Sequence, residues 1–168
     1  SYPNSLDDTQ VDNHSFTTSG SRGIRASFNI GAKPTVLLAL SGPNGMAWRL
    51  LVGARDGSLT LLSLPNMVLV ERLQPHDYEI TSLSAHPRSG GTVLLSGDRN
   101  GNIFVHGEQI PGNSVKLFSV DGVINAIHCE SECIHVHIGW ERQILNWDGT
   151  VKGKSYASKQ QRITVNAS

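Results

Sequence analysis

The sequence predicts an all-β protein, and three observations lead to this prediction. A glycine-led unit of turn and strand at 53–61 (GARDGSLTL) recurs at 97–105 (GDRNGNIFV) and, more weakly, at 139–148 (GWERQILNWD). The units begin at residues 53, 97 and 139, so they lie 44 and then 42 residues apart. Seventeen glycines separate short apolar runs, and no helical periodicity is present. A period of about 40–45 residues with a closing Trp-Asp is typical of the four-stranded propeller blade.

The individual strands are expected where short apolar runs lie between clusters of Gly, Asn, Asp and Pro. Asp56-Gly57 and Asn100-Gly101 each mark a hairpin, because such turns need residues with positive φ. A weak strand is also expected near the end of the chain, at 162–166. The strands predicted before it are 24–30, 35–41, 49–54, 58–64, 67–73, 79–85, 92–97, 102–107, 115–120, 123–128, 133–138 and 143–147.

The second unit carries a resemblance to a known family. From His76 it reads HDYEITSLSAHPRSGGTVLLSGDRNGNIFV, with a His opening the loop between blades and an apolar strand closed by His86-Pro87. Gly-led strands follow around Asn100-Gly101. This pattern resembles a WD-repeat, and the first and third units resemble it more loosely. The resemblance covers residues 35–148 and implies WD-repeat-like β-propeller blades, as about three four-stranded antiparallel sheets.

The resemblance also implies a bracing set of His, Ser or Thr, Asp and Trp in each blade, and this chain departs from it. The second blade offers His76, Ser96 and Asn100 but has His106 where the Trp is expected. The first blade keeps Asp56 and has Leu62 at the Trp position. The third blade keeps Trp147 but lacks the Asp-Gly turn. The usual network is therefore not expected to be complete in any of the three blades.

The domain organisation is expected to be a flexible arm followed by blades. Residues 1–22 are polar and aperiodic, which is typical of an arm. The blades then occupy 23–168, approximately as 35–73, 79–120 and 123–168.

Three blades make about half a ring, because propellers typically close with four to eight blades. An open arc would expose apolar faces and strand edges. The ring could be completed by a second copy as a two-fold dimer, by further sequence or another chain, or by a small fourth blade from 24–30 and the tail. In the dimer, 24–30 is expected to supply the outer strand that the last blade of the other copy lacks.

Composition and charge exclude several classes of function. With 38% hydrophobic and 17% charged residues, the chain has the composition of a globular domain. Fourteen basic and fourteen acidic residues give no net charge, which argues against a nucleic-acid partner. No apolar run reaches the length of about 18 residues that a membrane helix needs, so no membrane partner is expected. No secretory signal is visible, and the expected location is cytoplasmic.

The densest group of reactive side chains is the segment HCESECIHVH at 128–137. If residues 130–132 form a hairpin loop, Cys129 faces Cys133, and His135 and His137 point to the same side. Two thiolates and an imidazole (Cys129, Cys133 and His135) suit zinc. Alternate side chains on one strand lie about 7 Å apart, however, which is wide for one ion. A disulfide, or two ordinary buried thiols, are the other interpretations, and no cofactor is expected.

A partner-binding surface is expected at the loops 42–48, 74–79, 98–101 and 139–142. Arg55 and Arg99 occupy the same place in their turns, and Arg142 lies one residue later in its own. These side chains either form a cationic rim for an acidic peptide or are simply solvated. The candidate contact residues are Arg55, Arg99, Arg142, Trp48, Tyr78 and Trp140, although the Trp side chains could instead anchor the blades.

Together these patterns predict a protein–protein interaction scaffold that is not an enzyme. The sequence has no Ser-centred nucleophile elbow, phosphate loop or metalloprotease helix. The expected partners are a protein or peptide, and a second copy of the chain as a homodimer. The alternative hypothesis is a metal-binding or redox-sensing module built on the hairpin at 128–137.

Overall fold

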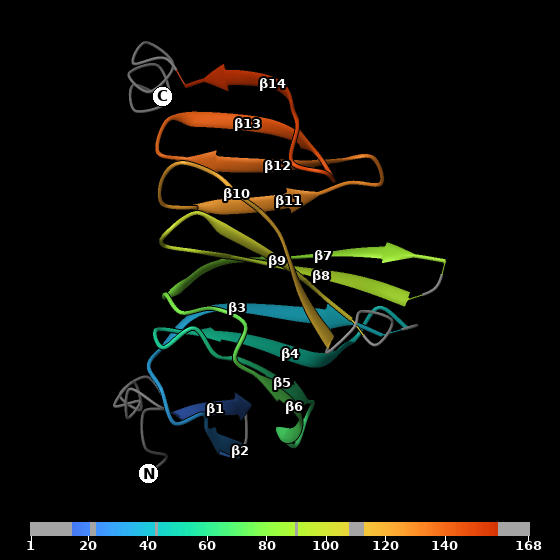
Figure 1. Cartoon of the computed structure of the whole chain (residues 1–168). Helices are drawn as coiled ribbons and strands as arrows, with labels where there is room; N and C mark the ends of the chain where they lie inside the picture. The colour runs from blue at the N-terminus through green and yellow to red at the C-terminus, as the bar shows by residue number, and fades with distance from the viewer. Residues whose placement is uncertain (1–14, 21–22, 43, 90, 108–112, 158–168) are drawn as a thin grey trace, which may run out of the picture. The chain divides into compact units, whose positions relative to one another are not determined.

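The computed structural model describes residues 15–20, 23–42, 44–89, 91–107 and 113–157. Every regular element in these ranges is a β-strand and none is a helix, which confirms the all-β prediction. The strands form three four-stranded antiparallel sheets and one two-stranded hairpin (Figure 1). None of the described residues forms a helix able to span a membrane. The chain divides into two compact units, Ser1–Leu83 and Ser84–Ser168, which we call unit 1 and unit 2.

The first two strands, β1 (Ser15–Gly20) and β2 (Gly23–Asn29), form the hairpin, with Phe16 opposite Phe28. Residues 15–20, which were expected to belong to a flexible arm, form strand β1. A Ser/Thr-rich strand carries no apolar alternation, and here its backbone ladder with β2 holds it in place. The other residues of the predicted arm, 1–14 and 21–22, lie outside the described ranges.

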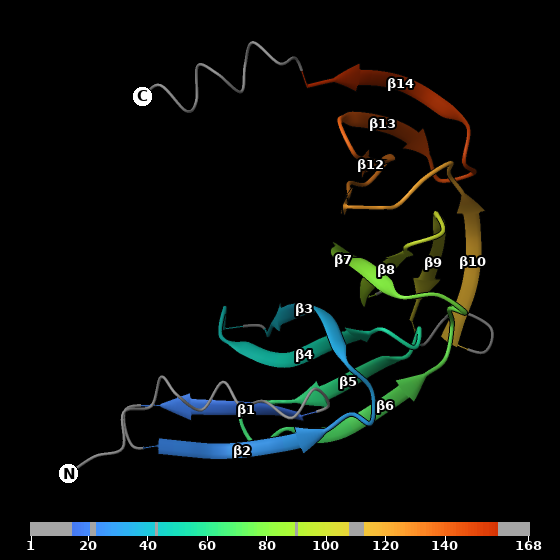
Figure 2. The same ribbon diagram turned by 90° about the vertical axis from the view of Figure 1, so that its left-hand side faces the viewer.

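Unit 1 contains the first sheet, in which consecutive strands are hydrogen-bonded neighbours (Figure 2). Gly53 on its second strand has no room for a side chain, since a Cβ there would lie 2.7 Å from Ile80 Cγ2 and 2.8 Å from Val36 Cγ1. The strands are β3 (Pro34–Ser41), β4 (Ala47–Ala54), β5 (Leu59–Ser63) and β6 (Val68–Leu73).

The second sheet has the same strand order, and the boundary between the two units falls inside its first strand. Its strands are β7 (Ile80–Arg88), β8 (Gly91–Asp98), β9 (Asn102–His106) and β10 (Ser114–Ser119).

The third sheet lies in unit 2 and has its own outer strand, β14. The prediction that 24–30 would supply that strand was wrong: β2 pairs with β1, and Ile30 is fully buried in the core of unit 1. The sequence VKGKSY of β14 is polar and forms an exposed edge, so hydrophobic alternation did not reveal it. The strand expected at 162–166 lies outside the described ranges. The strands are β11 (Ala126–Cys129), β12 (Cys133–Ile138), β13 (Glu141–Asn146) and β14 (Val151–Tyr156).

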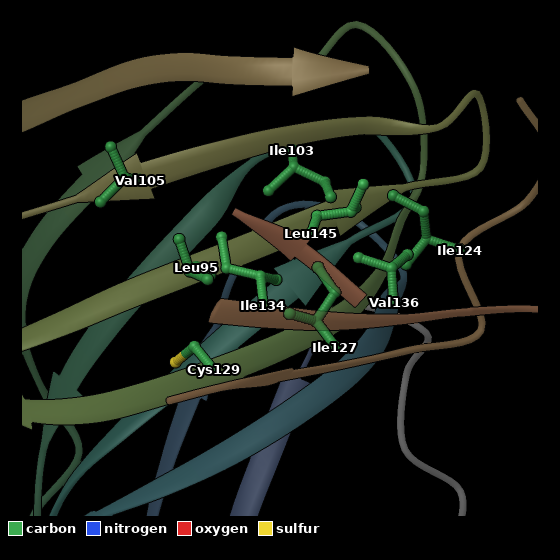
Figure 3. Close-up of a cluster of buried hydrophobic side chains, with 9 residues drawn as sticks. All are labelled: Leu95, Ile103, Val105, Ile124, Ile127, Cys129, Ile134, Val136 and Leu145. Carbon is green, nitrogen blue, oxygen red and sulfur yellow. The ribbon is translucent and has the colours of Figure 1, made fainter. Parts of the chain in front are cut away.

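Each unit has its own apolar core. In unit 1, Val52 and Leu62 of the first sheet pack with Ile30 and Met67. In unit 2, the second and third sheets pack together through Leu95, Ile103, Val105, Ile124, Ile127, Cys129, Ile134, Val136 and Leu145 (Figure 3). Burial of apolar surface contributes about 25 cal/mol per Å², so stacking of sheets supplies most of the stability that one sheet lacks.

Candidate functional site

The turn after β4 presents Arg55 at one end of unit 1. Asp56 Oδ1 accepts hydrogen bonds from the Ser58 backbone N (2.9 Å) and Oγ (2.6 Å), and Gly57 has φ of 83°. The loop that leads to β7 packs on this turn, since Gln74 Nε2 donates to Asp56 O (2.7 Å) and His76 N donates to Gly57 O (3.4 Å). Arg55 is exposed, and Tyr78 in the same loop is 49% exposed. The structure therefore brings these two predicted contact residues to the same end of the unit.

The turn after β8 presents Arg99 in unit 2 in the same way. Its acid is Asp98, which is fully buried and accepts hydrogen bonds from the Asn100 N (2.8 Å) and Asn102 N (2.9 Å). The prediction that Asn100 fills this role was wrong, because the Asp98 carboxylate accepts the backbone hydrogen bonds of this turn, one of them from Asn100 N. Spacing misled the prediction: Asn100 lies 44 residues after Asp56, whereas the acid of the second sheet comes two positions earlier.

Trp140 lies at the same end of unit 2 as Arg99. The linker before β11 contacts the turn after β8 and the end of β12, because Ile124 N donates to Asp98 O (3.4 Å) and Asn125 N donates to His137 O (2.8 Å). Trp140, in the turn after β12, is 53% exposed and accepts a hydrogen bond from Ala157 N (3.0 Å) at its backbone oxygen. Each of the two turns is thus held to a neighbouring segment by a backbone hydrogen bond.

Two of the predicted contact residues lie elsewhere. Arg142 belongs to strand β13 rather than to the turn, and its Nε donates to Ser155 Oγ (3.2 Å) on β14. Trp48 lies near the start of β4, at the opposite end of the strand from Arg55, where the Arg49 guanidinium stacks 4.0 Å from its ring centroid. The six predicted contact residues therefore do not form a single surface.

The bracing residues of the second sheet form a buried hydrogen-bonded chain. Ser96 Oγ lies 2.6 Å from His106 Nε2, and the other ring nitrogen of His106 bonds Ser114 Oγ. His106 thus takes the place of the expected Trp. At the corresponding position in the first sheet, Leu62 is fully buried in apolar surroundings. Trp147, after β13, packs at the edge of the unit 2 core, with the Arg88 guanidinium 4.4 Å from its ring centroid.

The two cysteines lie on opposite faces of the β11–β12 hairpin, so the prediction that they face each other was wrong. Cys129 pairs with Ile134, and Glu130 N donates to Cys133 O (2.9 Å), which leaves a two-residue turn one residue shorter than expected. Cys129 lies at one edge of the core cluster in Figure 3, with Ser84 Oγ 3.3 Å from its Sγ. Both thiols are free and buried. Burial raises the pKa of the Cys129 thiol, although the Ser84 hydrogen bond opposes this shift.

The other face of the hairpin gathers a different set of metal-ligand side chains. Cys133 Sγ lies 3.5 Å from Glu130 Oε2 and 3.5 Å from His135 Nε2, and His135 Nε2 lies 3.6 Å from Glu130 Oε1. His128, opposite His135 in the ladder, has its Nε2 3.8 Å from Glu130 Oε1. Burial raises the pKa of the Cys133 thiol, and the hydrogen bond and negative charge of Glu130 raise it further. His137 shares this face but lies one ladder step further along, opposite Ala126.

Sequence reasoning missed Asp98, Ser114, Glu130 and His128. The sequence contained a signal for Glu130 and His128. A two-residue turn at Ser131-Glu132 pairs Glu130 with Cys133 and His128 with His135, whereas the assumed three-residue loop pairs the cysteines. No short-range pattern revealed Ser114, which reaches His106 from the neighbouring strand β10.

Comparison with known proteins identifies the fold. No family model and no curated protein sequence matches the chain. The structure is similar to the crystal structure of Saccharomyces cerevisiae Sqt1, a WD40 β-propeller, with TM-score 0.70 and 12% identity over 86% of this chain and 42% of that chain. It is also similar to the computationally designed Ika8 protein, with TM-score 0.60 and 16% identity over 80% of this chain and 41% of that chain. The described sheets therefore have the fold of WD-like propeller blades, and the chain spans less than half the length of either structure.

Proposed function

We propose that this chain is part of a protein–protein interaction scaffold of WD-repeat type that has no catalytic activity. The observation that carries the proposal is the exposed pair Arg99 and Trp140 at one end of unit 2. Arginine and tryptophan are enriched among residues that dominate binding energy at protein interfaces. Turns whose backbone is already hydrogen-bonded lose less entropy on binding.

The proposed partner is a protein segment with acidic side chains. The turns after β4 and β8 each place an exposed arginine next to an acid, Asp56 or Asp98, whose carboxylate accepts backbone hydrogen bonds of the same turn. An arginine guanidinium binds carboxylates in a bidentate geometry, and an exposed aromatic ring at the same end of the unit adds apolar contact. Arg55 with Tyr78 in unit 1, and Arg99 with Trp140 in unit 2, would each form one such contact.

Affinity capture followed by mass spectrometry tests this surface. The double variant Arg99→Glu/Trp140→Ala should lower recovery of specific partners by about tenfold or more, since interface hot spots each cost more than about 1 kcal/mol. Matched controls are Lys116→Glu, an exposed charge on β10, and Trp48→Ala, an exposed tryptophan at the other end of its sheet. The captured partner would then be measured with purified proteins. Equal losses in the double variant and the controls, or no loss in the double variant, would refute the surface.

We also propose that a second copy of the chain completes the ring. Propellers typically close with four to eight blades, and the described residues of this chain form three four-stranded sheets. The dimer should have a mass twice the 18.2 kDa of one chain by light scattering. A stable species of 18.2 kDa would contradict self-association and leave completion to other blades. An intracellular location belongs to the same proposal, because the free thiols Cys129 and Cys133 suit a reducing compartment.

A further inference from the structure

The hairpin β11–β12 places metal-ligand side chains side by side on the face that does not carry the core. His128 pairs with His135 across the ladder, and Glu130 follows His128 at the turn, next to Cys133. Side chains of directly opposed residues share a face, and so do alternate residues on one strand. Carboxylate, thiol and imidazole groups from both sides of the turn therefore converge at the tip of the hairpin.

We propose that Glu130, Cys133 and His135 bind one zinc ion, with a water molecule in the fourth position. Their ligand atoms all lie within 4.8 Å of one another. Around tetrahedral zinc, bond lengths of about 2.3 Å to sulfur and about 2.0–2.1 Å to nitrogen and oxygen place ligand atoms about 3.3–3.6 Å apart. Cys133 Sγ lies 3.5 Å from Glu130 Oε2 and 3.5 Å from His135 Nε2, and the other carboxylate oxygen, Glu130 Oε1, lies 3.6 Å from His135 Nε2. These separations, which involve both carboxylate oxygens of Glu130, are close to the separations of ligand atoms around zinc.

The three proposed ligands differ in burial: Cys133 and His135 are largely covered by the sheet, whereas Glu130 is exposed to solvent. Cys133 is 7% exposed and the His135 side chain is 17% exposed, so the sheet holds both in position. The Glu130 side chain is 53% exposed and the neighbouring His128 side chain is 70% exposed, which leaves the ion a path from solvent. Three protein ligands with one open position is an arrangement that zinc commonly adopts.

The donor set selects against the common hard cations. Magnesium and calcium are bound by oxygen ligands, whereas this site offers one sulfur, one nitrogen and a carboxylate. Zinc binding requires the thiolate, so the Cys133 proton would pass to solvent as the Zn–S bond forms. The competing interpretation is a hydrogen-bond cluster in which the Cys133 thiol donates to Glu130 Oε2 and no ion binds.

Cobalt substitution distinguishes the two interpretations in the full-length protein. After chelator treatment, Co²⁺ should bind at one equivalent and give the thiolate-to-cobalt charge-transfer band and the visible bands of tetrahedral Co²⁺, and zinc should displace it. Cys133→Ala should abolish the charge-transfer band. Cys129→Ala, the matched cysteine on the opposite face, should retain it. Absence of the band in the wild-type protein, or its persistence in Cys133→Ala, would overturn the proposal.

Calorimetric titration with zinc alone gives a second test, in which the varied residue is Glu130 and the cysteines are unchanged. Glu130→Gln has the same shape as the native side chain and lies on the exposed side, so the fold is retained. It should weaken zinc binding by more than about 100-fold, since loss even of an outer-shell partner costs 10–100-fold. Glu132→Gln in the same turn and His137→Gln further along the same face are the controls and should bind as the wild type does. Unchanged affinity in Glu130→Gln would remove it from the ligand set and refute the site as proposed.

Discussion

The first and second sheets occupy equivalent positions in the repeat but fill them with opposite chemistry. Val52 and Ser96 lie 44 residues apart, as do Leu62 and His106. Val52 and Leu62 are fully buried in the apolar core of unit 1. Ser96 and His106 are buried to a similar extent, and the imidazole joins the Ser96 and Ser114 hydroxyl groups. The same backbone pattern thus accepts an apolar set or a hydrogen-bonded set.

This difference shows that the members of each set depend on one another. A buried polar group without a partner costs about 1–3 kcal/mol, whereas replacing both partners with apolar groups of similar shape is nearly neutral. One sheet can therefore lose the whole bracing network, and another can rebuild it with histidine in place of tryptophan. A mixture of the two sets within one sheet should be unstable.

The two sheets share the turns after β4 and β8. Replacing the glycine in either turn should have the largest effect on the free energy of unfolding. A Cβ at Gly57 would lie 2.1 Å from His76 O, and one at Gly101 would lie 1.9 Å from Val120 O, with φ of 83° and 89°. Gly57→Ala and Gly101→Ala should each lower the free energy of unfolding by about 4 kcal/mol, because left-handed strain of about 1–2 kcal/mol adds to a clash with a backbone atom. Urea unfolding followed by circular dichroism would measure both.

Gly45→Ala is the matched control for these two turns. Gly45 also has a positive φ of 74°, but a Cβ there would meet nothing within 4 Å. Its cost should be limited to the strain of about 1–2 kcal/mol. Equal costs at all three positions would show that the packing of the following loop on the turn contributes nothing, and that the two sheets share only a turn conformation.

The repeat and the strand alternation predicted the three sheets, because both signals are local and repeat along the chain. Asp56-Gly57 and Asn100-Gly101 marked their turns correctly, since positive φ strongly favours glycine. β14 was missed because an exposed edge strand needs no apolar face, and its order depends on the ladder with β13. β1 was missed because its sequence, SFTTSG, has no apolar alternation.

The hairpin at 128–137 shows why the candidate site was harder to predict than the fold. Its residue types were recognised, but shortening the turn by one residue changed which side chains share a face. As a result, Cys129 lies in the core cluster, and Glu130 rather than Cys129 lies next to Cys133 and His135. Register depends on the turn geometry, and Cys-Glu-Ser-Glu-Cys contains no glycine or proline to fix it.

Replacing the hydrogen-bonded residues of the second sheet with the apolar residues of the first should lower the free energy of unfolding by an intermediate amount, and the effects of the single substitutions should not add. His106→Leu removes the imidazole from two hydroxyl groups and should cost about 2 kcal/mol, within the range for buried groups that lose a partner. Adding Ser96→Val removes the more buried hydroxyl as well. The double variant should therefore be less destabilised than the sum of the single variants, by about 0.5–3 kcal/mol. A double-mutant cycle by urea unfolding measures this coupling, and strict additivity would contradict the dependence of one residue on the other.

The smallest expected effect has the opposite sign and concerns a buried hydroxyl within the apolar set. Thr60 is 1% exposed and pairs with Val52 in the ladder, and its Oγ1 has no hydrogen-bond partner among the described residues. Thr60→Val keeps the β-branched shape and removes the unpaired oxygen. It should raise the free energy of unfolding by about 0.5–1 kcal/mol, the lower part of the cost of an unpaired buried hydroxyl.

Ser96→Ala provides the comparison for Thr60→Val, because it also removes a buried hydroxyl but one that is paired with His106 Nε2. The free energy of unfolding of the Ser96→Ala variant should fall, since the His106 imidazole loses a partner in a region with little access to water. Urea unfolding of the two variants under identical conditions should therefore give changes of opposite sign. If Thr60→Val is destabilising by as much as Ser96→Ala, the Thr60 hydroxyl has a hydrogen-bond partner, and the buried face of the first sheet is not purely apolar.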